Sequence, residues 1–367
     1  MNTTYVKEEK IKLKRGYTTG SSATAAAKAA LLSIINQQTI ENIDILLPKR
    51  SSIQIPILSC EFERNKAKCS VIKDGGDDPD VTHGAEIIVE LSFTGKVNQI
   101  DIDGGEGVGI VTKPGLGLEI NKPAINPIPK KMIIENLRGL GEKILAKKGI
   151  RVIISVPKGK ELGPKTDNPR LGITDGISIL GTSGIVIPFS TASYAASIRQ
   201  NLDVAIAMGD NVVVLTTGGR SEDLAKKMID LPEHCFVQMG DFSGYTIQQC
   251  SKKNIKKAYV VGFIGKLAKM AAGVKQTHVK GSKVDMSFLA ELAKICNADK
   301  NVIQDIKKAN TARHVSEIIQ ENKIEGFFDL ICGETYKHMR KHSEEKVSMD
   351  VILFGFDGNI LARESEE

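Results

Sequence analysis

The sequence lacks tryptophan, and phenylalanine and tyrosine make up only 5% of its 367 residues. Proteins that bind single-stranded nucleic acid stack bases on aromatic side chains, so this class is disfavoured. Long apolar runs are missing too: the best, residues 177–189, contains glycines and is shorter than the roughly 18 residues that span a bilayer. The charged first 15 residues contain no apolar signal segment. We therefore expect a cytoplasmic protein that binds neither nucleic acid nor a membrane.

The six cysteines form no C-x-x-C pair and lie far apart in the sequence, at Cys60, Cys69, Cys235, Cys250, Cys296 and Cys332. Disulfide frameworks and structural zinc sites both use clustered cysteines. The spacing therefore predicts reduced, mostly buried thiols and no metal site of the protein's own.

The net charge of +6 is unevenly spread along the chain. Residues 1–195 contain 26 Lys and Arg against 21 Asp and Glu, whereas the remainder contains 24 against 23. A modest basic excess suits an anionic small molecule as well as a phosphate backbone, and the charge alone leaves both open.

The length favours two domains. Glycine is concentrated in the first half, where 19 of the 34 glycines lie between Gly75 and Gly184. Short β-branched runs there predict strands, and alanine-rich or amphipathic segments predict helices at 21–32 and 132–147. We expect a glycine-rich α+β domain over residues 1–195, with strands at 43–47, 53–58, 67–72, 86–93, 97–102 and 151–156.

The second half alternates regularly between apolar strands and helices. Strands at 210–215, 235–239 and 257–262 are separated by helices at 222–229 and 245–253, and a late strand is expected at 350–354. This alternation is typical of parallel βαβ units. Residues 196–367 are therefore predicted to form a Rossmann-like α/β domain, which makes the whole chain α/β and α+β.

A Thr-Thr-Gly-Ser-Ser turn precedes the first helix. Thr18, Thr19, Ser21 and Ser22 offer hydroxyls beside free N–H groups and the positive end of the helix dipole, and Arg15 adds charge nearby. Such an arrangement can bind a carboxylate or a phosphate. The alternative is an ordinary Ser/Thr helix cap.

The segment 73–84 is the most unusual in the chain, because Asp74, Asp77, Asp78, Asp80 and His83 are packed between glycines and a proline. Carboxylates so close repel one another, which favours a role in acid–base chemistry or in ligand binding. The alternative is a solvated turn. The spacing is not that of an EF-hand, so a calcium site is not expected.

Two further glycine-rich segments are candidate ligand loops. Residues 104–109, which contain Glu106, resemble a dinucleotide fingerprint, but no helix start follows, and no P-loop sequence occurs. Residues 168–186 contain a Gly-Thr-Ser-Gly turn with the hydroxyls of Thr182 and Ser183. A structural turn between apolar strands would have the same sequence.

Several long blocks occur in the order that is typical of one family. They are RGYTTGSSATAAAKAA, VIKDGGDDPDVTHGA, IDGGEGVGIVTKPGL, KTDNPRLGITDGISILGTSGIV and VVGFIGKLAKMAAG. Together they resemble the cobalt-precorrin-5B C(1)-methyltransferase (CbiD) family of anaerobic cobalamin biosynthesis. The resemblance extends from about residue 12 to at least residue 273.

The resemblance implies transfer of a methyl group from S-adenosylmethionine to carbon C1 of cobalt-precorrin-5B, giving cobalt-precorrin-6A. Cobalt then enters only as part of the corrinoid substrate, whose carboxylates suit the basic first half. A carrier that binds the tetrapyrrole without catalysis is the alternative. Whether the chain forms a homo-oligomer is left open.

Site residues can be assigned on this basis. The acid–base candidates are Asp78 and His83, followed by Asp77, Asp80 and Glu106. The expected substrate-binding residues are Arg15, Thr18, Thr19, Ser21, Ser22, Lys113, Arg170, Thr182 and Ser183. Because ligands bind at the carboxyl ends of parallel strands, the methyl donor is expected at Thr216, Gly218, Gly219, Asp241 and Gly262.

Overall fold

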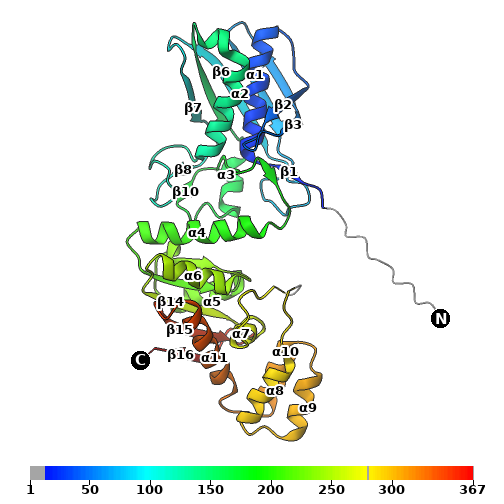
Figure 1. Cartoon of the computed structure of the whole chain (residues 1–367), viewed down its shortest axis with the longest axis vertical. Helices are drawn as coiled ribbons and strands as arrows, with labels where there is room; N and C mark the ends of the chain where they lie inside the picture. Colours follow the sequence, from blue (N-terminus) through cyan, green and yellow to red (C-terminus); the bar gives the residue numbers. More distant parts are fainter. Residues whose placement is uncertain (1–12, 279–280, 367) are drawn as a thin grey trace, which may run out of the picture. The chain divides into compact units, whose positions relative to one another are not determined.

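A computed structural model describes residues 13–278 and 281–366. The chain divides into two compact units, Met1–Ser190 and Thr191–Glu367, called here the N-terminal and C-terminal units (Figure 1). Helices and mixed sheets occur in both, which confirms the mixed α/β class. Among the described residues, no helix is both long and apolar enough to cross a membrane.

The N-terminal unit is built on a five-stranded sheet with the order β4-β5-β6-β9-β7. Neighbouring strands are antiparallel except β7 and β9, which are parallel. The predicted strands at 67–72, 86–93 and 151–156 are found here, whereas β4 was not predicted. The strands are β4 (Ser59–Phe62), β5 (Lys66–Ile72), β6 (Glu86–Thr94), β7 (Ile100–Gly104) and β9 (Gly149–Ser155).

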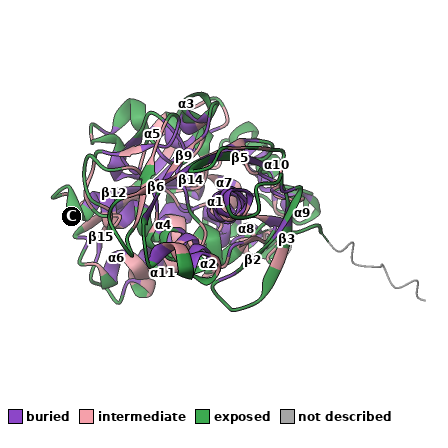
Figure 2. Cartoon of the chain, turned by 90° about the horizontal axis from the view of Figure 1, so that it is seen from above, coloured by how far each residue is buried: buried purple, intermediate pink, exposed green. Residues whose placement is uncertain are grey.

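Two helices pack together in the N-terminal unit, α1 (Thr19–Asn36) and α2 (Pro127–Leu145), and α1 also contacts β5 and β6. Alanine lets α1 approach its neighbours closely, and most of its residues are buried. Figure 2 shows the helix end-on, coloured as buried. α2 begins five residues before the predicted start at residue 132, and its first turn contains Pro127 and Pro129. Proline is tolerated in the first turn of a helix, where its missing N–H costs no hydrogen bond.

Short strand pairs fix the loops that contain the predicted motifs. β1 pairs with β11, and β8 pairs with β10, both antiparallel. A hairpin of β2 and β3 lies beside α1 and α2. The bounds are β1 (Gly16–Tyr17), β11 (Ile185–Val186), β8 (Ile110–Val111), β10 (Ile173–Thr174), β2 (Asn42–Leu46) and β3 (Ser52–Pro56), and a short helix α3 (Gly159–Leu162) leads into the 3-10 turn η1 (Gly163–Lys165).

The C-terminal unit contains a second five-stranded sheet, with the order β13-β12-β14-β15-β16. The first four strands are parallel, as the alternating sequence predicts. The last strand is antiparallel and was not predicted: a turn at Gly358, with φ +94°, reverses the chain immediately after β15. The strands are β12 (Val212–Thr216), β13 (Phe236–Gln238), β14 (Lys257–Phe263), β15 (Ser348–Phe354) and β16 (Ile360–Ser365).

Helices cover both faces of this sheet. Val213 and Leu215 of β12 join the larger apolar core, whereas Val214 faces a smaller core that includes Ala225 of α5. The helices are α4 (Thr191–Ala207), α5 (Gly219–Met228), α6 (Ser243–Lys252), α7 (Ile264–Ala271), α8 (Met286–Ile295), α9 (Lys300–Lys308), α10 (Ala312–Glu321) and α11 (Phe327–His342), with a 3-10 turn η2 (Glu233–Cys235).

Candidate functional site

The predicted anion site at the start of α1 is occupied by the protein's own hydrogen bonds. The Thr18 hydroxyl accepts from the Ser21 N–H at 3.2 Å and so caps the helix. Ser21 Oγ donates to the Gly184 carbonyl at 2.7 Å, and Thr19 Oγ1 accepts from the Leu180 N–H at 2.9 Å. All these side chains are buried. In this conformation the hydroxyls fasten α1 to the 178–184 segment.

Four other predicted substrate-binding residues of the N-terminal unit each have different surroundings. Arg15 and Thr182 are exposed, and the side chain of Lys113 packs closely over Gly172. Ser183 Oγ exchanges hydrogen bonds with the backbone of Ile185. These roles in substrate binding remain predictions.

Each carboxylate of the acidic loop has a donor. Asp74 accepts from Lys14 Nζ at 2.7 Å, and Asp77 accepts from the Lys14 backbone N–H at 2.6 Å. Asp78 Oδ1 accepts from the Phe189 N–H at 2.8 Å, and Asp80 Oδ2 pairs with Lys73 Nζ at 2.5 Å. The Gly76 N–H also donates to Asp74, and the Thr82 N–H donates to Asp80. The loop therefore has an ordered network of hydrogen bonds and is not a freely solvated turn.

Local charges keep two of these carboxylates ionised. The Lys14 hydrogen bond and the Gly76 N–H lower the pKa of Asp74 below its ordinary value. Burial alone would raise the pKa of Asp80, but the charge and hydrogen bonds of Lys73 and Thr82 outweigh it, so the pKa is lowered. Lys73 is only 2% exposed, so Asp80 neutralises a buried ammonium group.

His83 lies at the rim of a hollow of about 450 Å³. Its side chain is 55% exposed, and its Nδ1 accepts a hydrogen bond from the Gly75 N–H at 2.9 Å. The hollow combines apolar and charged groups, and its lining residues are Lys14, Tyr17, Pro56, Ile57, Leu58, Ile72, Lys73, Asp74 and His83.

Glu106 is exposed on a turn whose glycines serve backbone packing. A Cβ at Gly107 would lie 1.9 Å from the Val156 carbonyl oxygen, and a Cβ at Gly159 or Gly176 would lie 2.0 or 2.2 Å from the Gly107 oxygen. Three backbone segments therefore touch where only glycine fits. This packing explains the glycines without a nucleotide, and it leaves an acid–base role for Glu106 as a prediction.

Most of the predicted donor residues meet at the carboxyl edge of the C-terminal sheet. β12 is followed in the chain by β13 on one side, and β14 lies on its other side, so β12 and β14 flank a topological switch point. Thr216 ends β12, and Gly218 and Gly219 begin α5. A Cβ at Gly262 of β14 would lie 2.8 Å from Thr217 Cγ2. The ends of β12 and β14 are therefore in close contact here, and glycine leaves the space for it.

The start of α5 is open. Gly218 has no side chain with which to cap the helix, and a Cβ there would meet no described atom within 4 Å. The Thr216 hydroxyl is fully buried and has no hydrogen-bond partner among the described residues. The free N–H groups of such a helix N-terminus are a suitable place for a carboxylate.

Asp241 lies beyond the end of β13 and already has partners. Its carboxylate pairs with Lys266 of α7 and accepts from Thr277 Oγ1 at 3.0 Å, and burial lowers the pKa of Lys266. Asp241 thereby anchors the segment after α7, and a ribose contact would compete with these bonds.

An aromatic pair at the same edge was missed from the sequence. Phe263 is the last residue of β14, and Phe356 lies just after β15; their rings stack with centroids 5.3 Å apart. The guanidinium of Arg220 lies 5.2 Å from the centre of the Phe263 ring. No spacing rule links residues 220, 263 and 356, because only the parallel strand order brings them together.

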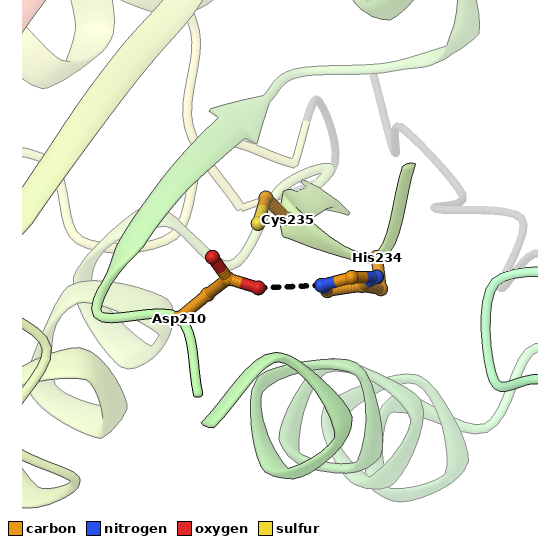
Figure 3. A group of neighbouring side chains, drawn as sticks. All are labelled: Asp210, His234 and Cys235. Carbon is orange, nitrogen blue, oxygen red and sulfur yellow. Dashed lines mark hydrogen bonds and ion pairs between the residues drawn. The ribbon is translucent and has the colours of Figure 1, made fainter. Parts of the chain in front are cut away.

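Three possible metal donors, Asp210, His234 and Cys235, lie within 4.8 Å of one another (Figure 3). His234 Nε2 and Asp210 Oδ2 are 2.6 Å apart, which is a direct hydrogen bond. Zinc would hold such ligands about 3.3 Å apart around itself. The pair instead ties η2 to the segment that enters β12, at the amino edge of the sheet.

Comparisons with known proteins identify the family. The family model CbiD matches residues 6–188, and the model for the CbiD C-terminal domain matches residues 276–365. A cobalt-precorrin-5B C(1)-methyltransferase of Priestia megaterium is 45% identical over 98% of each chain. The chain belongs to the CbiD family. Proteins with the same name from Geobacillus kaustophilus (48% identity, 89% of this chain and 87% of the relative) and Leptospira interrogans (43%, 96% of each) are also similar.

Among solved structures, the CbiD cobalamin biosynthesis protein of Archaeoglobus fulgidus is 29% identical to this chain. The match covers 72% of this chain and 81% of that one, with a TM-score of 0.39.

In this CbiD protein, the sequence motifs located the acidic loop but not the hollow beside it. The missed lining residues, Tyr17, Ile57, Leu58 and Ile72, come from β1, from the β3–β4 connection and from the end of β5. A sequence does not show which leucines are exposed, and single exposed leucines are common on protein surfaces, so Leu58 could not be recognised as part of a binding surface. The one available signal is that the β3–β4 connection is apolar where a turn would ordinarily be polar.

Proposed function

We propose that the protein transfers a methyl group from S-adenosylmethionine to carbon C1 of cobalt-precorrin-5B in cobalamin biosynthesis. The observation that carries this function is the 45% identity to a named cobalt-precorrin-5B C(1)-methyltransferase over 98% of both chains. Methyl transfer is the reaction that this name states.

We propose the carboxyl edge of the C-terminal, Rossmann-like sheet, within residues 196–367, as the donor site. The fit is supported by the open start of α5 at Gly218 and Gly219. These groups suit the carboxylate of the donor's methionine part, with Gly262 forming the neighbouring wall. When bound, the donor supplies an activated methyl group on a positively charged sulfur.

We propose that residues 1–195 bind the corrinoid. Support comes from the hollow beside His83, whose apolar and hydrogen-bonding groups match a macrocycle with an apolar ring and a fringe of carboxylates. The main task of such an enzyme is to align the ring carbon with the methyl group, and alignment can contribute about 7–11 kcal/mol. Acid–base roles for Asp77, Asp78 and Glu106 remain secondary proposals.

The site of action proposed here is the cytoplasm. None of the described cysteines forms a disulfide, which agrees with a reducing compartment. The cobalt belongs to the substrate.

Incubation with cobalt-precorrin-5B and S-adenosylmethionine tests the reaction. We expect one methyl group to be added, and isotope-labelled methyl should appear on C1 by nuclear magnetic resonance. Mass spectrometry that finds bound corrinoid without a gain of methyl would favour the carrier instead.

A further inference from the structure

We propose that His83 is a hydrogen-bond donor that binds a peripheral carboxylate of the corrinoid, and that the adjacent apolar side chains contact the macrocycle. This inference rests on the proposed function, and it assigns His83 a binding role in place of the acid–base role expected from the sequence. The exposed ring at the rim of the hollow carries the proposal.

The backbone fixes the tautomer of His83. The Gly75 N–H can only donate, so Nδ1, which lies 2.9 Å from it, must be the unprotonated nitrogen. A neutral imidazole then carries its proton on Nε2. Because a base needs an unprotonated nitrogen facing the substrate, and Nδ1 is already used, the free side of this ring can only donate.

The loop that holds His83 is suited to an anion despite its four aspartates. Asp74 and Asp80 are paired with the ammonium groups of Lys14 and Lys73. Asp77 and Asp78 accept backbone N–H groups. The two ion pairs reduce the formal charge that the four aspartates present to a carboxylate approaching the Nε2–H of His83, and the backbone N–H groups partly offset the charge of Asp77 and Asp78.

The wall of the hollow is unusually apolar for a protein surface. Leu58 is 58% exposed and Ile72 is 39% exposed, and both line the hollow together with Ile57. An apolar wall beside an N–H donor and an ammonium group complements a flat, mostly apolar ring with charged edges. A small hydrophilic anion such as phosphate would leave that wall in water.

Two probes and four variants, the fourth being Leu58→Ser in the apolar wall, test the inference. Cobyrinic acid carries free carboxylates on a corrin ring, and its heptamethyl ester carries none; the corrin absorbance reports binding of either. His83→Ala removes the donor, His83→Gln keeps an N–H near the position of Nε2, and His314→Ala removes an exposed histidine of the C-terminal unit as a matched control.

We expect His83→Ala to raise the Kd of the acid about tenfold, His83→Gln to restore most of the affinity, and His314→Ala to have no effect. The ester should bind all of these proteins equally. Leu58→Ser should weaken both probes. In the methyl-transfer assay, His83→Ala should raise KM and leave kcat within about twofold.

An unchanged Kd of the acid in His83→Ala, or no binding of the acid to the unaltered protein, would overturn the inference. Equal loss of kcat in His83→Ala and His83→Gln would also overturn it and restore a base. If the acid binds as expected but no methyl is transferred by the unaltered protein, the proposed function fails while the binding role of His83 stands.

Discussion

Two Thr-Thr-Gly segments begin helices in this protein, and their surroundings differ. Thr18 caps α1 and Thr19 is its first residue, and their hydroxyls are buried and hydrogen-bonded to backbone groups. Thr216 and Thr217 precede α5, where the Thr216 hydroxyl has no described partner and a glycine begins the helix. The same Thr-Thr-Gly sequence therefore forms structural hydrogen bonds in one unit and an open helix start in the other.

The difference shows that a motif of hydroxyls and glycine at a helix start does not by itself identify a ligand site. What decides is whether another segment supplies carbonyls and N–H groups to the hydroxyls. The 178–184 segment does so for α1. The described contacts of Thr216 include no such segment.

The largest expected effect on stability separates two glycines: Gly181, which packs against Thr18 at the start of α1, and Gly218, which precedes α5. A Cβ at Gly181, where φ is +135°, would lie 2.3 Å from Thr18 Oγ1, whereas a Cβ at Gly218 would meet open space. Gly181→Ala should lower the free energy of unfolding by about 4 kcal/mol through strain and overlap. Gly218→Ala should change it by less than about 0.5 kcal/mol. Urea denaturation measures both, and equal losses would erase the contrast.

The next largest effect on stability concerns the ion pair between Asp80 and the buried Lys73. Asp80→Asn would leave the buried Lys73 ammonium without its counter-ion and should cost about 3 kcal/mol at neutral pH. The native pairing lowers the pKa of Asp80, so its stabilisation is complete above the unfolded value of about 3.9 and is lost as the pH falls through the folded value.

Denaturation of the two proteins at several pH values checks this prediction. The difference in unfolding free energy should be constant above about pH 5 and shrink below about pH 4. A difference that persists unchanged into acid would mean that Asp80 acts through packing and not through charge.

A smaller effect separates the two threonine positions. Thr19→Val removes a hydroxyl that accepts the Leu180 N–H, so we expect a loss of about 2 kcal/mol. Thr216→Val replaces a buried hydroxyl without a described partner, so stability should be unchanged within about 1 kcal/mol, or rise. Thermal unfolding of both variants measures these changes in stability. Equal losses in Thr19→Val and Thr216→Val would contradict the contrast between the two helix starts.

The positions of most strands and helices could be predicted from the sequence, because the alternation of apolar and polar residues along each element is a local pattern. It predicted the parallel strands β12, β13 and β14 and the aspartate-rich loop. It could not distinguish Thr19 from Thr216, because their hydrogen-bond partners lie far away in the chain. Nor could it predict the antiparallel β16, which depends on one tight turn at Gly358.

The hollow beside His83 was beyond sequence reasoning for a related reason. Leu58, Ile72 and His83 come from three separate segments, and only the pairing of β4 and β5 and the return of the loop place them around one space. The tautomer of His83 depends on a single backbone N–H, that of Gly75.

Calorimetric titration with S-adenosylhomocysteine tests most directly the claim that the open start of α5 binds the donor and the closed start of α1 does not. The proteins to compare are the unaltered chain, Gly218→Ala, Thr216→Val and, as the matched control, Thr19→Ser. We predict a Kd raised about tenfold, or about 1.4 kcal/mol, in Gly218→Ala, because the added methyl group enters the open helix start. We predict an unchanged Kd in Thr216→Val, whose hydroxyl is buried, and in the control. The same Kd in all four proteins would contradict the account.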